Sequence, residues 1–191
     1  ELNRHGIFLQ EHAMFAVAFQ TNRFDPDRMV ETYLNTGVDH VLYYPYQKNM
    51  VVALANTACI DQLAFQNQII FQFADKVSRC FDSPVGVSGL YYKYEQLPAM
   101  ISASVKALNL SFYHVQPRRV YHAHDAADSR SLEAYFQRWE ENLNRSLRSG
   151  ELQGVPGQVE QLMDYISGEM PGDVDMVKQF LFRVLTNFYI M

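Results

Sequence analysis

The chain has 191 residues, of which 48% are hydrophobic and 19% are charged, and its formal net charge is −5. This composition excludes a disordered segment, a collagen-like repeat and a disulfide-built miniprotein, and the length fits one domain with a sizeable appendage or two small domains. Because the chain is acidic and its longest basic run is Arg118-Arg119, it can displace few counter-ions from nucleic acid, so we expect no direct DNA binding.

Two further features predict the cellular setting. The apolar run from Ala13 to Phe19 is the longest in the chain and falls far short of the roughly 20 residues that cross a bilayer. Cys59 and Cys80 lie in helical, apolar patterns without a CxxC pair, so we predict two buried, reduced thiols. We therefore expect a cytoplasmic protein without membrane contact. The chain begins at Glu1 and stops at Met191 after an apolar stretch, and we interpret it as a piece of a longer protein.

The first elements in chain order alternate between strand and helix patterns. Ala13 to Phe19 is typical of a strand that is buried on both faces. Asp25-Pro26-Asp27 predicts a helix N-cap followed by proline in the first turn, and Gly37 ends that helix. Val38 to Tyr44 and Met50 to Ala55 predict two antiparallel strands joined by a loop of four or five residues.

The alternation continues through the middle of the chain. Apolar residues recur at helical spacing from Ile60 to Phe81 and predict a long amphipathic helix. Pro84 marks the end of this helix. Pro84 to Gly89 predicts a short strand of small residues, and Glu95 to Leu110 predicts another amphipathic helix. Arg118 to His122 has the length of a last edge strand. Together these elements predict a mixed sheet with helices mostly on one face.

Beyond residue 125 no β-rich run remains, and most of the net negative charge lies in this last third of the chain. A helical stripe runs from Ser131 to Leu147 with Trp139 at its centre, where we expect a core residue. Pro156 to Met170 and Val174 to Tyr189 predict two more helices. The last helix has a wide apolar face, which needs a partner either within the chain or outside it.

These patterns predict a fold of the α/β (α+β) class in three parts. Residues 1–12 form an N-terminal linker helix, residues 13–125 an α/β domain, and residues 126–191 an all-helical connector.

The order of elements and several local phrases resemble the GGDEF fold, the α/β domain of diguanylate cyclases. Val85-Gly86-Val87-Ser88-Gly89 resembles the strand before the family's last helix. Within Leu97 to Leu108, Ala103 and Ala107-Leu108 resemble that helix itself, and Val115 to Val120 resembles the turn into the final strand. The resemblance covers the first 125 residues and implies a GGDEF-like mixed sheet with packed helices.

The catalytic motifs of that family are degenerate here. Where an active cyclase carries two Mg²⁺-binding acids at the end of the first strand, the matching stretch, Phe19 to Phe24, has amides. The hairpin that should contain Gly-Gly-acid-Glu-Phe is Tyr46-Gln47-Lys48-Asn49-Met50, without glycine or carboxylate. Mg²⁺ is a hard cation that prefers carboxylate oxygen at a phosphate site. We therefore expect no enzyme activity, no catalytic residue, no metal and no cofactor.

A degenerate GGDEF-like domain followed by an acidic three-helix segment resembles the central region of bacterial AraC-type transcription regulators. These include response regulators of two-component systems, whose first domain is a phospho-receiver. The resemblance implies a non-catalytic role in signal relay or dimerisation. It also implies a homodimer that contacts DNA only through a helix-turn-helix domain after Met191.

Two groups of tyrosines are candidates for a ligand-binding groove or a protein interface. The candidate residues are Tyr43, Tyr44, Tyr46, Tyr91 and Tyr92. Tyrosine offers an apolar ring and a hydroxyl group, which suit either kind of surface. A half-buried sheet produces the same pattern, so a structural role is the alternative. These residues carry the alternative function, a small-molecule or nucleotide sensor without turnover.

Two acidic or histidine-rich stretches are candidates for metal ligands. His122, His124 and Asp125 form the most metal-like cluster, but a closed structural site needs four ligands, so we interpret the two histidines as an exposed strand end. Asp25 and Asp27 could be displaced ligands of a still active cyclase. Acids in the first turn of a helix favour capping instead, because they meet the positive end of the helix dipole.

Overall fold

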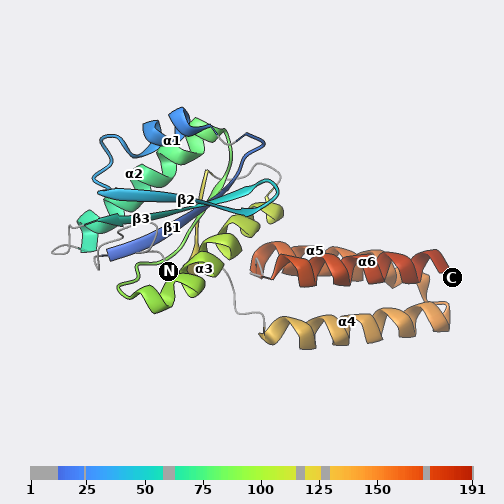
Figure 1. Ribbon diagram of the computed structural model, residues 1–191. Helices are drawn as coiled ribbons and strands as arrows, with labels where there is room; N and C mark the ends of the chain where they lie inside the picture. The colour runs from blue at the N-terminus through green and yellow to red at the C-terminus, as the bar shows by residue number, and fades with distance from the viewer. Residues whose placement is uncertain are drawn as a thin grey trace.

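The chain forms a five-stranded sheet with helices on both faces, followed by three helices (Figure 1). The computed structural model describes residues 13–23, 25–57, 63–114, 119–125, 130–169 and 173–190. The strands are β1 (Ala13–Gln20), β2 (His40–Gln47), β3 (Met50–Thr57), β4 (Val85–Val87) and β5 (Val120–His122). The helices are α1 (Pro26–Tyr33), α2 (Leu63–Phe81), α3 (Leu97–Asn109), α4 (Arg130–Ser149), α5 (Val155–Glu169) and α6 (Val174–Ile190).

The sheet is mixed, as the sequence predicts. Its strand order is β2-β3-β1-β4-β5, in which β4 and β5 pair in parallel and the other neighbours pair antiparallel. The elements from β1 to β4 follow the ferredoxin-like βαββαβ arrangement, to which α3 and β5 are added. The mixed α/β fold class is therefore confirmed, and β5 is an edge strand as expected.

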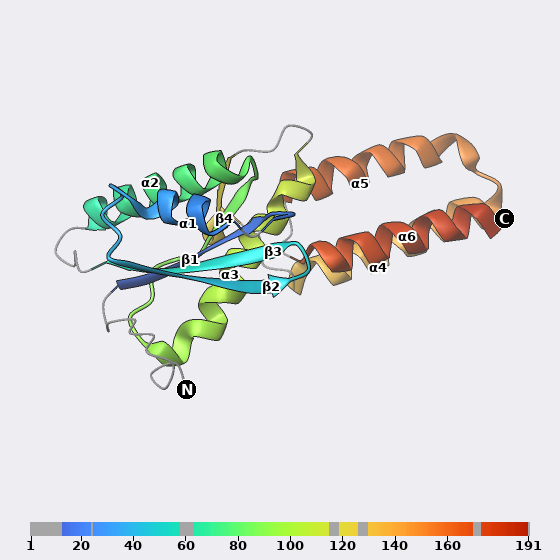
Figure 2. The same ribbon diagram turned by 45° about the horizontal axis from the view of Figure 1, so that its top comes forward.

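β1 is the central strand, and its side chains supply both cores. Phe15, Val17 and Phe19 lie in the cluster that α2 covers, whereas the alternate residues Met14 and Ala16 face α3. This alternation is the period-two geometry of a strand. The prediction of a strand buried on both faces is confirmed. The helices, however, divide between the two faces of the sheet, with α3 opposite α2 (Figure 2).

The β2–β3 hairpin differs from the prediction. β2 continues through Pro45 to Gln47, so only Lys48 and Asn49 form the turn. Proline lacks a backbone N–H and is tolerated on an edge strand or at a bulge. β2 meets both conditions, because it lies at the edge of the sheet and its register shifts between Pro45 and Gln47. The predicted loop of four or five residues is therefore wrong.

Several other expectations concern the ends of elements. The helix predicted from Ile60 is described from Leu63 onward, and its expected first turn lies outside the described residues. The linker helix over residues 1–12 and the thiol of Cys59 also lie outside them. Cys80 is a free thiol and is half-buried rather than buried.

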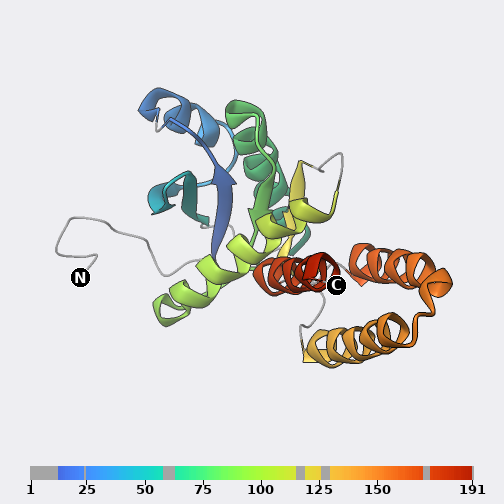
Figure 3. The ribbon, with the colours of Figure 1, turned by 90° about the vertical axis from the view of Figure 1, so that its right-hand side faces the viewer.

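The three C-terminal helices pack around an apolar cluster of their own (Figure 3). Trp139 belongs to it, as expected, and its indole N–H donates to the Gln158 carbonyl at 2.9 Å. Tyr113, just after α3, also packs against this cluster, and Lys178 Nζ lies 5.1 Å from the centre of the Phe112 ring. The division of the chain into domains at residue 125 stays a prediction.

Within the described residues, none of the helices combines the length and the apolar character needed to span a bilayer.

Candidate functional site

The structure brings together the two stretches, 19–24 and 46–50, that the resemblance to diguanylate cyclases singles out. The end of β1 and the β2–β3 turn lie side by side at the same end of the sheet's strands, since Gln20 pairs with Met50 and the Thr21 N–H donates to the Asn49 carbonyl at 3.0 Å. We call this border of the sheet, formed by strand ends, the motif edge. Phe24, at the end of the first stretch, lies outside the described residues.

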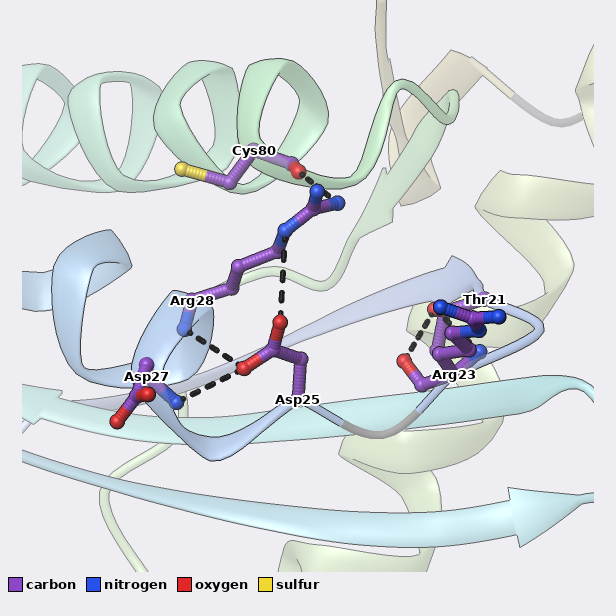
Figure 4. A network of polar contacts seen from close by, with 6 residues as sticks. All are labelled: Thr21, Arg23, Asp25, Asp27, Arg28 and Cys80. Carbon is purple, nitrogen blue, oxygen red and sulfur yellow. Dashed lines mark hydrogen bonds and ion pairs between the residues drawn. The ribbon is translucent and has the colours of Figure 1, made fainter.

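Hydrogen bonds of the backbone and of hydroxyl groups hold the motif edge. The Gln20 N–H donates to Ser83 Oγ at 3.2 Å. Thr21 Oγ1 donates to the Arg23 carbonyl at 2.7 Å and accepts from the Arg23 N–H at 3.2 Å, which closes a tight loop (Figure 4). The described side chains of the two stretches are amides, a hydroxyl group, apolar groups, Tyr46, and the cations of Arg23 and Lys48. These stretches offer a divalent cation no carboxylate.

Asp25 is the first carboxylate after the motif edge, and it is engaged in the fold. Its Oδ1 accepts the backbone N–H groups of Asp27 at 3.1 Å and Arg28 at 3.4 Å, while its Oδ2 lies 3.6 Å from Arg28 Nε (Figure 4). Arg28 also donates to the Cys80 carbonyl at 3.4 Å, linking α1 to the end of α2. The prediction that Asp25 caps the helix is confirmed, with Asp27 in the first turn.

The tyrosines of β2 have different surroundings. The Tyr43 hydroxyl donates to the Met29 carbonyl at 3.0 Å and is also hydrogen-bonded to Thr32, and its ring packs edge-on against Phe19. Tyr43 therefore joins β2 to α1. Tyr44 and Tyr46 are exposed, so they are the residues of this group that a ligand or partner can reach.

The second tyrosine group lies at the opposite edge of the sheet. Tyr91 forms a bridge with Met14 through two backbone hydrogen bonds of 2.7 and 2.8 Å, and Tyr92 is exposed. Tyr44 lies beyond Val52 of β3, which pairs with Ala18 of β1. The offset from Met14 to Ala18 is about 13 Å along the strand, and the two groups are about 14 Å apart across the sheet. The structure does not join them into one groove, and their role in binding stays a prediction.

A pocket of about 560 Å³ opens at the edge of the sheet opposite the motif edge. We call it the β4–β5 pocket, because it lies at the carboxyl ends of these two strands. Its lining residues are Asn67, Ile70, Phe71, Ser88, Gly89, Leu90, His122 and His124. Three separate segments contribute them, so the sequence alone gave no reason to group them.

The two histidines of the pocket are the residues that the sequence analysis weighed as candidate ligands, whereas Ser88 and Gly89 entered it only as part of a strand motif. His122 is half-buried and His124 is exposed, and their rings stack at 5.2 Å with an angle of 22° between the planes. Among the residues that the structure describes, no group of three His, Cys, Asp or Glu side chains is placed to hold a metal ion.

Comparison with family models, curated proteins and solved structures finds no match to this chain.

Proposed function

We propose that this chain is a non-catalytic regulatory module that relays a signal and self-associates, within a cytoplasmic bacterial transcription regulator of the AraC type. The observation that carries the proposal is the chemistry of the motif edge. Amides and cations lie where a GGDEF-like enzyme would need carboxylates for Mg²⁺. Asp25, the first acid after the end of β1, already accepts two backbone N–H groups and pairs with Arg28.

Phosphoryl transfer through metal ions needs a clamp on both the attacking and the leaving oxygen. Mg²⁺ accepts that role when one or two carboxylates anchor it. The charged side chains of the two stretches, Arg23 and Lys48, are both cationic, so their charges would oppose a Mg²⁺ ion bound near them. The edge therefore supports a structural role for this part of the fold.

An exposed apolar stripe on α6 supports self-association. Val177, Phe180 and Val184 of this helix are buried in the three-helix cluster. Phe182 and Leu185 have exposed fractions of 73% and 67%, and their spacing of three residues places them on the same side of the helix. Two large apolar side chains side by side offer a contact for a second copy of the chain.

Light scattering across a range of concentrations tests self-association. We expect a dimer that becomes monomeric when Phe182→Glu and Leu185→Glu are combined, because a dimer would bury four unpaired carboxylates. Val30→Glu is the matched control, since Val30 is 47% exposed on α1, and it should leave the dimer unchanged. A wild-type chain that is monomeric at every concentration would contradict this part of the proposal.

Incubation with GTP or ATP and Mg²⁺, followed by chromatography of the nucleotides, tests the absence of turnover. We expect the nucleotide to be recovered unchanged. Mg²⁺-dependent product that disappears in Asp25→Asn would show instead that Asp25 serves as a displaced metal ligand, and would overturn the non-catalytic assignment.

The β4–β5 pocket favours a second candidate, a small-molecule sensor without turnover. Its volume falls in the range of about 300–1,000 Å³ that is usual for ligand sites. A thermal-shift panel of metabolites and nucleotides tests this candidate. A compound that raises the melting temperature supports it, and a panel without any effect counts against it.

A further inference from the structure

We propose that the β4–β5 pocket binds a small planar aromatic carboxylate. The proposal rests on the second candidate function, the sensor, and it does not depend on self-association through α6. It places the ligand at the edge of the sheet opposite the motif edge, where Leu90 of the pocket directly precedes Tyr91 in the chain.

The position of the pocket follows from the strand directions. β4 and β5 pair in parallel with Val87 opposite His122, so the two strands end at the same edge of the sheet. In sheets with parallel strands, ligands bind in crevices outside the carboxyl ends. One wall of the crevice comes from α2, where Asn67, Ile70 and Phe71 lie on one side of the helix at spacings of three and four.

The apolar part of the pocket includes an aromatic ring that the core does not use. Ile70 is buried and Leu90 is half-buried, and together they form the floor of the pocket. Phe71 is 54% exposed, although Phe73 and Ala74 in the next turn are fully buried. An aromatic ligand can pack against the exposed ring of Phe71 in the offset or edge-on geometry that aromatic pairs prefer.

The polar part of the pocket favours an acid as the ligand. Two histidines, His122 and His124, line the pocket, and an imidazole ring carries an N–H group of the kind that donates to carboxylate oxygens. Among the lining residues that the structure describes none is acidic, so these residues offer a cationic ligand no counter-charge.

The same two histidines fit a metal ion poorly. A metal lies in the plane of each imidazole that binds it, about 2.0–2.1 Å from the nitrogen. Two stacked rings whose planes differ by only 22° share no point so close to both rings. An organic acid is therefore the better match to these rings.

Gly89 leaves the pocket open above the backbone. A Cβ atom added there would meet no heavy atom within 4 Å, and Gly89 does not have a positive φ. The fold therefore has room for a larger residue at this position. Gly89→Leu would place a side chain of four carbons at a residue that lines the pocket, without a clash at its Cβ.

The experiment is a titration of the ¹⁵N-labelled chain with indole-3-carboxylate, followed by two-dimensional NMR. We expect saturable shifts at residues 67–71, 88–90 and 122–124. Gly89→Leu should weaken binding by about tenfold or more, while indole-3-carboxamide, which has the same shape without the charge, should bind the wild-type chain about tenfold more weakly. Gly168→Leu is the matched control, because a Cβ at Gly168 of α5 also meets nothing within 4 Å.

Three results would overturn the proposal: no saturable shift at about 10 mM ligand, unchanged binding in Gly89→Leu, or equal binding of the acid and the amide. The thermal-shift panel separates this failure from a failure of the sensor function. If a compound outside the aromatic acids stabilises the chain, the sensor stands and the ligand class proposed here is wrong.

Discussion

Gly86→Ala tests how closely α3 lies against the sheet. A Cβ atom at Gly86 would lie 2.0 Å from the backbone nitrogen of Leu108 and 2.2 Å from the carbonyl oxygen of Ser104. The third contact, at 2.6 Å, is with Leu108 Cα. All three atoms belong to the backbone of α3, so no change of side-chain rotamer can relieve the clash.

The size of the effect follows from the movement that alanine requires. Real Cβ contacts essentially never fall below 3.0 Å, so α3 must move away from β4 by about 1 Å. That movement would loosen the packing of Met100 and Leu108 against β1 and β3. Overpacking costs typically about 1–3 kcal/mol, and we expect about 3 kcal/mol here because backbone meets backbone. This is a large part of the roughly 5–15 kcal/mol that stabilises a protein.

Urea unfolding followed by circular dichroism measures this loss. Gly89→Ala is the matched control, three residues further along the chain, since its Cβ would meet nothing within 4 Å. We expect the control to change the free energy of unfolding by at most about 1 kcal/mol, and in the stabilising direction, because alanine restricts the unfolded chain. If Gly86→Ala costs no more than the control, α3 does not pack on β4 as described.

Three further predictions concern single side chains. Asp25→Ala should lower the free energy of unfolding by about 0.5–2 kcal/mol, because α1 loses its N-cap. Asp25→Asn should keep most of the wild-type stability, since asparagine also caps helices. An Asp25→Ala variant with the wild-type urea midpoint would refute the role of Asp25 as a cap. Asn56→Leu should raise the melting temperature, since both amide atoms of Asn56 are buried without a hydrogen-bond partner in the described structure; a lower melting temperature would show that the amide is satisfied. Burial, and secondarily the charge of Asp173, raise the pKa of Tyr113 above its ordinary value of 10.0. The unfolded state therefore loses this proton first, so stability should fall as the pH rises above about 10, and Tyr113→Phe should reduce that fall in a pH series of melting temperatures.

Local signals in the sequence predicted much of the fold. The continuous apolar run of β1 indicated a strand buried on both faces, because no alternate residue was polar. Asp25 followed by Pro26 marked the start of α1, since both residues act within one turn of the chain. Gly150, which adopts a φ of +74°, ends α4 for the same local reason.

Features that depend on the position of a strand in the sheet were missed. Pro45 was expected to lie in a loop, because the sequence does not show that β2 is an edge strand. Gly86 was recognised only as a small residue. Glycine is required at position 86 because α3, which crosses the face of the sheet opposite α2, approaches the backbone of β4 closely there. The β4–β5 pocket was missed because its walls come from α2, from the segment that follows β4, and from the end of β5 with the turn after it. Only the pairing of β4 with β5 brings the last two together.

The two candidate sites lie at opposite edges of the sheet because β1 runs antiparallel to both of its neighbours. The end of β1 therefore meets the start of β3 and β4, which forms the motif edge. The start of β1 lies at the edge where β4 and β5 end. His122 and His124 belong to the last strand and turn before α4, which begins at Arg130. A ligand in the β4–β5 pocket would thus contact the segment that leads directly into the helices, whereas a nucleotide at the motif edge would contact α1. Of the two edges, the one with the pocket is therefore the better placed to couple ligand binding to the self-association that we propose for α6.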